Sequence, residues 1–236
     1  MPTANAIETV WKPVRYVCGA INKSYQNMGS AAFRIAFLMV LLAVCGVALS
    51  WLQPWIDPRW LYMDSKAVGE LRGSCCNVYD GAISNLGLML WAGTAAIALF
   101  VATMSAARGR NYLVEGSAFF LSTVLLLDDA FMLHEHVFPR IGIPQTLVIV
   151  GLGTLTLAYL SLAFKRLIGC RQRWLLVLSL MMFATSVLVD QILHTNSTII
   201  IVLEDGPKFI GIVCWFLFHL NLFLEEMNDW IDQVAA

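Results

Sequence analysis

The chain has 236 residues, of which 59% are hydrophobic and only 13% charged, and its formal net charge is −1. Soluble domains average roughly half apolar and a quarter charged residues, so this composition argues against an ordinary soluble domain. The balanced charge, with no basic patch, argues against a nucleic-acid-binding surface. We therefore expect an all-α, polytopic integral membrane protein surrounded by a lipid bilayer.

The first 32 residues are expected to form a cytoplasmic segment at the membrane surface. Apolar residues recur there near helical spacing, at Ile7, Val10, Trp11, Val14 and Ile21. Lysine and arginine fall on other faces, which favours an amphipathic helix lying flat at the lipid interface; a floppy tail is the alternative. The first long apolar run exceeds the about 7 to 15 residues of a signal-peptide core, so we expect a retained helix.

About six apolar runs have the length that a helix needs to cross a hydrocarbon core of about 30 Å. They lie within a transmembrane domain over residues 33–236, at 33–52, 84–106, 112–137, 144–166, 174–195 and 207–228. A loop at about 53–83 follows the first run. The loop and the helix end before it carry aromatic residues typical of a membrane-interface belt, namely Trp51, Trp55, Trp60 and Tyr62.

The distribution of lysine and arginine predicts the orientation. Ten of the 15 precede or open the first span, or lie between the second and third spans or the fourth and fifth. The side of the membrane that is richer in these residues is usually cytoplasmic. Both termini are therefore expected in the cytoplasm and the loop at 53–83 outside it, with the bacterial inner membrane as the expected location.

Ionisable residues gather at the extracytoplasmic ends of three predicted spans. The third and fifth spans run outward and the sixth runs inward, so these ends lie at one membrane depth. An ionisable side chain costs several kcal/mol in hydrocarbon unless it is paired, hydrated or bound to an ion, and so indicates function. The residues are Asp128, Asp129, His134, Glu135 and His136 in the third span, Asp190 and His194 in the fifth, and Glu204, Asp205 and Lys208 in the sixth.

Two spans carry a polar stripe. The stripe of the third span consists of Glu115, Ser122, Asp129 and His136, each seven residues apart. That of the fifth consists of Ser179, Ser186, Asp190 and His194. Steps of seven residues drift by only about 20° around a helix, and polar stripes in membranes face one another or water. We expect these spans and the sixth to line a common interior, with His219 as a hydrogen-bonded core residue.

Structural roles are the alternative for several of these residues. Asp205 is suited to cap the sixth helix, with Pro207 in its first turn. Lys208 is suited to snorkel to the interface or to be the counter-ion of Asp190 or Asp129. Two adjacent carboxylates point about 100° apart on a helix, so at least one of the two in the third span is expected to face the interior.

The first functional interpretation is a metal-dependent enzyme, for example a lipid-active hydrolase, whose substrate is a lipid or another small molecule. Zinc is the expected metal, because imidazole and carboxylate suit it and a catalytic zinc needs only three protein ligands and a water. Glu135 is the candidate general base and Lys208 the candidate group for a developing anion. The candidate metal ligands are Asp128, Asp129, His134, His136, Asp190 and His194.

Two other interpretations are retained. The stripe from Glu115 to His136 reaches across most of the membrane, as a relay in a proton- or cation-coupled transporter or channel requires. In the third interpretation the protein is an accessory subunit of a membrane complex, and its buried ion pairs fix helix packing. Small residues such as Gly151, Gly153 and Ser161 would then contact a protein partner.

Overall fold

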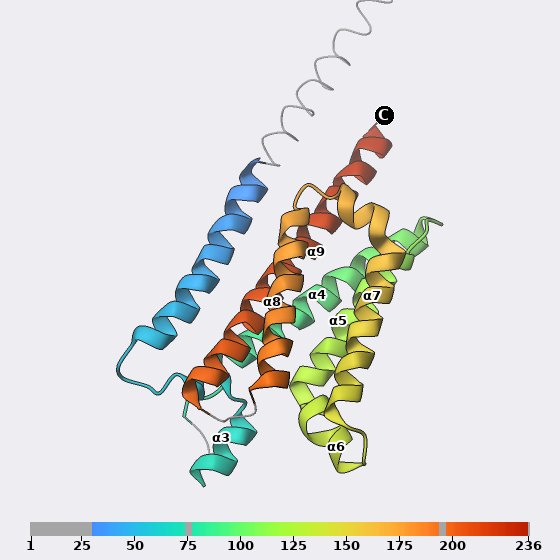
Figure 1. The fold of residues 1–236 in the computed structure, drawn as a ribbon. Helices are drawn as coiled ribbons and strands as arrows, with labels where there is room; N and C mark the ends of the chain where they lie inside the picture. The colour runs from blue at the N-terminus through green and yellow to red at the C-terminus, as the bar shows by residue number, and fades with distance from the viewer. Residues whose placement is uncertain (1–29, 74–76, 194–196, 236) are drawn as a thin grey trace, which may run out of the picture. The chain divides into compact units, whose positions relative to one another are not determined.

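The computed structural model describes residues 30–73, 77–193 and 197–235, and all regular secondary structure in these ranges is helical (Figure 1). The predicted surface segment over residues 1–32 lies almost wholly outside the described residues. The chain divides into two compact units, Met1–Met39 and Val40–Ala236. Of the first unit, only the beginning of the helix Ser30–Leu52 is described.

The second unit contains the end of this helix and the elements that follow it. These are α2 (Arg59–Tyr62), α3 (Ser65–Arg72), α4 (Ala82–Ala107), α5 (Leu113–Phe131), η1 (Leu133–Val137), α6 (Phe138–Arg140), α7 (Gln145–Gly169), α8 (Arg173–Ile192) and α9 (Thr198–Ala235). The element η1 is a single π-helical turn. The segment 53–83, predicted as a loop, thus contains the two short helices α2 and α3.

Several helices are long and apolar enough to cross a membrane. Four meet this description singly, namely Ser30–Leu52, α4, α7 and α8. A fifth candidate is the pair formed by α5 and the helical residues Leu133–Arg140, which are bent by 57° at the break. The all-helical prediction is confirmed, and α9 covers the sixth predicted span. By length and composition, residues 30–73, 77–193 and 197–235 contain four or five candidate spans, against about six predicted.

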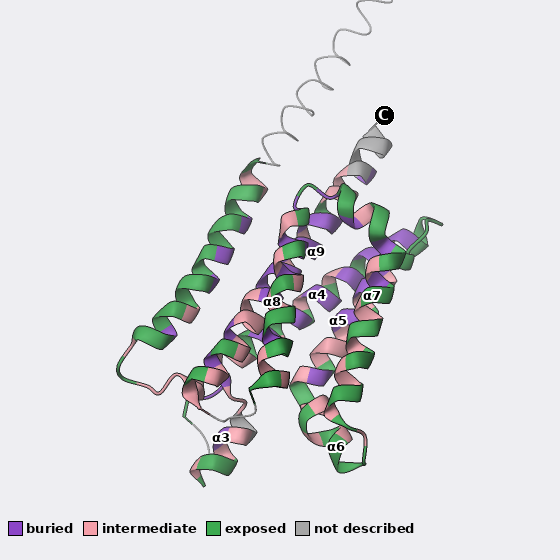
Figure 2. Cartoon of the chain, viewed as in Figure 1, coloured by how far each residue is buried: buried purple, intermediate pink, exposed green. Residues whose placement is uncertain are grey.

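The outer faces of the candidate spans are apolar. Leu147 and Leu157 on α7 and Val177 and Met181 on α8 are all more than half exposed, and Figure 2 shows exposed residues along both helices. Soluble proteins rarely expose such extensive apolar surface. These faces therefore suit contact with lipid tails.

The last helix is longer than predicted. The sequence placed Asp205 and Pro207 at the start of a helix over 207–228, whereas α9 begins at Thr198 and ends at Ala235. Pro207 therefore lies inside α9, where it has no N–H to donate to the carbonyl of Leu203. The capping role considered for Asp205 is wrong, because this residue lies about two turns inside the helix.

The predicted helix over 112–137 is broken near its C-terminal end. α5 ends at Phe131, and Met132 adopts the left-handed backbone conformation with a φ of 48° before η1 begins. This conformation costs a non-glycine residue roughly 1–2 kcal/mol. Contacts on both sides of the break offset that cost, because Asp128 accepts a hydrogen bond from the backbone N–H of His134 at 3.1 Å.

The core of the second unit contains four aromatic side chains from four helices, which we call the aromatic layer. Trp91 of α4 stacks on Phe183 of α8, with ring centroids 5.7 Å apart. Trp215 of α9 lies 6.0 Å from Trp91 and 5.8 Å from Tyr159 of α7. Gly211 permits close approach of α8 and α9, since a Cβ there would lie 2.8 Å from the Phe183 ring.

Candidate functional site: an acidic pocket

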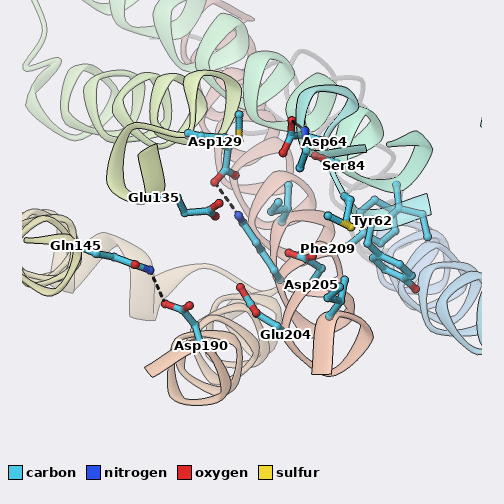
Figure 3. Close-up of a pocket in the computed structure, with 18 residues that line it drawn as sticks. Tyr62, Asp64, Ser84, Asp129, Glu135, Gln145, Asp190, Glu204, Asp205 and Phe209 are labelled. Atoms are coloured by element: carbon cyan, nitrogen blue, oxygen red, sulfur yellow. Dashed lines mark hydrogen bonds and ion pairs between the residues drawn. The ribbon is translucent and has the colours of Figure 1, made fainter. Parts of the chain in front are cut away.

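A cavity of about 340 Å³ lies where α5, α8, α9 and α4 meet the segment around α2 and α3 (Figure 3). Among the residues whose side chains the structure describes, its lining carries six carboxylates and one ammonium, so with every one of these groups ionised it would hold five negative charges in excess. The charged lining residues are Asp64, Asp129, Glu135, Asp190, Glu204, Asp205 and Lys208. We call this cavity the acidic pocket.

Asp129 is the best-satisfied carboxylate of the acidic pocket. Its Oδ1 lies 2.9 Å from the Lys208 ammonium, and its Oδ2 accepts a hydrogen bond of 2.9 Å from the Trp91 indole N–H. The Lys208 side chain is 31% exposed and that of Asp129 15%. Of the two counter-ions considered for Lys208, Asp129 is therefore the one that it contacts, and the pocket's ammonium is already paired.

Among the described residues, the hydrogen-bond partners of Asp190 are neutral. Its Oδ2 accepts hydrogen bonds from the side-chain amides of Gln145 at 3.0 Å and Gln191 at 2.8 Å. Amides orient a carboxylate but do not neutralise its charge. Gln145 is not among the candidate site residues predicted from the sequence, although it opens the fourth predicted span at the expected depth of the other pocket residues.

The remaining carboxylates face the same space from different elements. Figure 3 shows Glu135 of η1, Asp190 of α8 and Glu204 of α9 around one cavity. Within the described part of the chain, neither Glu204 nor Asp205 has a hydrogen bond or ion pair through its carboxylate. Glu204 lies one turn before Lys208 on α9, so that ammonium is the nearest positive charge on its own helix.

Asp128 and Asp129 have separate roles, as their 100° difference in direction predicted. Asp128 is buried, and its Oδ2 lies 2.6 Å from Nδ1 of His134, so it stabilises the break before η1. Nε2 of His134 lies 3.5 Å from Oε1 of Glu135. The break therefore places Glu135 in the lining of the pocket and directs the His134 ring back toward Asp128.

The predicted site residues are only partly brought together. Among the eight, those that line the acidic pocket are Asp129, Glu135, Asp190 and Lys208. Asp128, His134 and His136 are outside its lining, and His194 lies outside the described residues. The described residues contain no group of three or more histidine, cysteine or carboxylate side chains placed to hold one metal ion. The six proposed ligands are therefore not assembled into one site in the described ranges.

Tyr62 belongs to the wall of the pocket rather than to an exposed aromatic belt. It is 3% exposed, and its hydroxyl lies 2.7 Å from Oγ of Ser50. Burial raises the pKa of the Tyr62 phenol, which keeps it protonated and able to donate. Tyr62 therefore faces the interior of the second unit, because α2 turns its side chain inward.

Polar contacts continue from the pocket into the core. Trp215 donates a hydrogen bond of 3.2 Å to Oγ of Ser122. His219 is fully buried; its Nδ1 lies 2.8 Å from the carbonyl oxygen of Trp215 and its Nε2 lies 2.8 Å from the Tyr159 hydroxyl. Because a carbonyl only accepts, Nδ1 carries the proton and Nε2 accepts from Tyr159. The expectation that His219 is a hydrogen-bonded core residue is confirmed.

A second group of charges lies at the other end of α5, and we call it the second ionic cluster. It consists of Glu115, Arg166 and Glu226. One guanidinium nitrogen of Arg166 donates to Oε1 of Glu115 at 2.5 Å, and another contacts Oε2 of Glu226. The seven-residue spacing predicts a polar stripe that includes Glu115, whereas the positive-inside rule accounts for Arg166 only as a cytoplasmic charge. Glu226 is not among the residues predicted from the sequence.

A spacing in the sequence could have indicated these two residues. Arg166 lies seven residues after Tyr159, and Glu226 lies seven after His219. Tyr159 and Arg166 therefore lie on one face of α7, and His219 and Glu226 lie on one face of α9. The faces that meet at the Tyr159–His219 hydrogen bond also meet at the Arg166–Glu226 ion pair.

The comparisons with known proteins identify a family without an established activity. Residues 35–222 match a domain of unknown function, DUF8692. No curated protein and no solved structure gives a significant match. The match covers most of the chain, which therefore belongs to the DUF8692 family.

Proposed function

We propose that this protein is a proton- or cation-coupled membrane transporter that binds its cation in the acidic pocket. The observation that carries the proposal is the charge imbalance among the described lining residues, which place six carboxylates around a cavity of about 340 Å³ and one ammonium that is already paired with Asp129. Carboxylates in surroundings of low dielectric constant are costly unless they are paired, hydrated or protonated. A bound cation would supply the missing positive charge.

The chemistry of the lining favours a cation that prefers oxygen ligands. The described lining offers carboxylates and the Gln145 amide, but no imidazole or thiolate. Magnesium and calcium take oxygen ligands, and magnesium keeps several of its waters. A water occupies about 30 Å³ in the liquid, so a cavity of about 340 Å³ has room for a hydrated divalent ion.

Transport is favoured over chemistry at one face because charged groups lie at both ends of α5. Glu115, Ser122 and Asp129 are seven residues apart, so the first and last are separated by about 21 Å along a helix. That is much of a hydrocarbon core of about 30 Å. Between the acidic pocket and the second ionic cluster, Trp215 of the aromatic layer binds Ser122, as expected for a carrier closed on that side.

We also propose six spans, with α9 as the sixth, and both termini in the cytoplasm of a bacterium whose inner membrane contains the protein. The support is the distribution of lysine and arginine, ten of 15 on one side. The acidic pocket would then face the extracytoplasmic side. Single cysteines introduced at Asn111 and Gly142 should react with an impermeant reagent from opposite sides of the membrane, and labelling from one side would contradict the topology.

The test of cation binding uses the full chain, purified and returned to liposomes. Titration calorimetry with magnesium, calcium or manganese should detect a binding site in the wild type. Asp190→Asn and Glu204→Gln should weaken binding at least about tenfold, equivalent to 1.4 kcal/mol. Asp57→Asn is the matched control, because Asp57 pairs with Arg59 outside the pocket.

Ion flux into the same liposomes should depend on the same carboxylates. A wild type that binds none of the three ions and carries none across the bilayer would refute the proposal. If the pocket variants instead lost a co-purifying protein, an accessory subunit would be the better interpretation.

A metal-dependent enzyme is the second candidate function, because of one contact. Asp128 holds Nδ1 of His134, which leaves Nε2 free for a metal, with Glu135 3.5 Å from it. A carboxylate that orients a histidine in this way is common around metal ligands. Zinc found by mass spectrometry in the wild type but absent from His134→Ala, together with hydrolysis of a lipid, would favour this candidate over transport.

A further inference from the structure

Glu115 is an unusual charge for a membrane helix. Its side chain is completely buried on α5, and its Oε1 accepts the bond from Arg166. Its Oε2 is buried and has no hydrogen-bond partner among the residues that the structure describes. A buried carboxylate oxygen without a donor is costly if the group is ionised, because the oxygen has lost its water and gained nothing in return.

One guanidinium serves two carboxylates in the second ionic cluster. Arg166 contacts Glu115 with one nitrogen and Glu226 with another, and the Glu226 side chain is only 14% exposed. If both acids were ionised, the cluster would hold one uncompensated negative charge. Two carboxylates that share one site do not readily ionise together, and a shared proton is the usual solution.

In the described ranges, Arg166 is the one cation that forms an ion pair with Glu115 or Glu226. On α7, the Tyr159 hydroxyl donates a hydrogen bond to Nε2 of His219 on α9, and the Nδ1–H of His219 donates to the backbone carbonyl of Trp215. With Nε2 acting as an acceptor, His219 is neutral. From the end of α4, the Arg108 guanidinium lies over the Trp230 ring, 4.8 Å from its centroid. Cys170, which follows α7, is a buried thiol whose pKa burial raises to about 12, so it carries no charge.

We propose that Glu115 and Glu226, bridged by Arg166, form a proton-binding site at the opposite end of the bundle from the acidic pocket. The site holds one proton between the two carboxylates. The bridging Arg166 is 31% exposed and Glu226 is partly exposed, so the proton exchanges with water at that end of the bundle. This inference rests on the proposed transport function, for which it identifies the proton as the coupling ion.

The helical register connects this site to the acidic pocket. On α5, Asp129, Ser122 and Glu115 follow one another at seven-residue steps, and each contacts a different partner: Lys208, Trp215 and Arg166, respectively. The partners Lys208 and Trp215 are themselves seven residues apart on α9. A change in the tilt of α5 against α9 would therefore alter the pocket and the proton-binding site together.

Infrared spectroscopy of the full-length protein in lipid tests the proposal. The wild type should show the C=O band of a protonated carboxyl group at neutral pH, and the band should disappear on titration to alkaline pH. Glu115→Gln and Glu226→Gln should each remove it. Glu70→Gln, on the exposed face of α3, is the matched control and should leave it unchanged.

Two results would overturn the proposal. One is the absence of the band from the wild type between about pH 5 and pH 9, the range in which a shared proton should be bound or released. The other is a band that persists in both Glu→Gln variants. If Glu115→Gln does not fold, the proposal is tested by the loss of the C=O band in Glu226→Gln. The spectrum of wild-type protein that carries isotope-labelled glutamate then tests whether the band belongs to a glutamate.

Cation binding at the acidic pocket is measured separately by calorimetry, so the two proposals fail separately. A cation bound at the pocket without a protonated carboxyl group would refute the proton-binding site alone. The infrared band without any bound cation would refute the transport proposal and leave the proton-binding site in place.

Discussion

Replacing Lys208 by methionine tests the electrostatics on which the acidic pocket depends. Methionine is of similar length and carries no charge. At 2.9 Å, the attraction between Lys208 and Asp129 is about 6 kcal/mol with an effective dielectric constant of about 20, before the cost of desolvation is subtracted. Removing one partner of a fully buried pair costs about 3–5 kcal/mol, whereas exposed pairs contribute about 0.2–1 kcal/mol.

The Lys208–Asp129 pair lies between these limits, since its side chains are 31% and 15% exposed. We therefore expect Lys208→Met to lower the free energy of unfolding by about 2–3 kcal/mol. Asp129→Asn should cost less, because asparagine can still accept the bond from Trp91 and removes one of six negative charges. The double variant should recover about 1–2 kcal/mol relative to the sum of the single effects.

Denaturant unfolding of the purified protein in detergent, followed by tryptophan fluorescence, measures these differences. A divalent cation should stabilise Lys208→Met more than the wild type, because it should bind more tightly once the ammonium is gone, and the stabilisation by a ligand of the folded protein grows with the logarithm of its affinity. Stability of Lys208→Met within about 0.5 kcal/mol of the wild type, or additive effects within the same margin, would refute the electrostatic argument.

Three further substitutions test the packing around the site by the same unfolding measurement. Gly211→Ala should destabilise the protein by about 1–3 kcal/mol, because its Cβ would meet an aromatic ring at 2.8 Å; Gly151→Ala, with nothing within 4 Å, should not. Met132→Gly should raise the unfolding free energy by up to about 1 kcal/mol by relieving the left-handed backbone, and a loss would contradict the strain. Tyr159→Phe should cost about 1–3 kcal/mol, since it leaves Nε2 of His219 unsatisfied; an unchanged midpoint would mean that water replaces the hydroxyl.

The helices and the meeting of charges at one depth were predictable from the sequence. Apolar runs give helix positions because a span needs a fixed length, and chain direction gives the depth of each end. Seven-residue spacing then puts Asp129 on an inward face. With these rules alone, Asp129, Asp190 and Lys208 were expected in one interior, and all three line the acidic pocket.

The details of the site depend on contacts that have no local sequence signal. No glycine or proline marks the break at Met132; it depends on the bonds between Asp128 and His134. The predicted start of α9 is wrong because proline is common in the first turn of a helix, so that Pro207 indicates a first turn there. Instead, the apolar residues that begin at Ile199 add about two turns before Pro207, so that α9 begins at Thr198. Glu204 therefore lies within the helix and lines the pocket.

The partners of the buried acids were also beyond local pattern. Arg166 lies in a basic segment that satisfies the positive-inside rule, and nothing in that segment distinguishes a residue that faces lipid headgroups from one that reaches inward. Only the contact with Glu115 does so. Charge distribution thus predicts topology, whereas the assignment of a particular basic residue to an ion pair requires the rotation of its helix.

The way in which α5 and α9 are joined supports motion between them. α4 packs directly against both helices, whereas α5 and α9 are connected through the long side chains of Lys208, Trp215 and Arg166. Tightly packed membrane helices usually meet through small residues that let their backbones approach. Ion pairs and indole hydrogen bonds at the end of long side chains can break and re-form at little backbone cost. A cation that displaced Lys208 from Asp129 would therefore release the connection between the two helices at the acidic pocket, while the connection at Glu115 still held them.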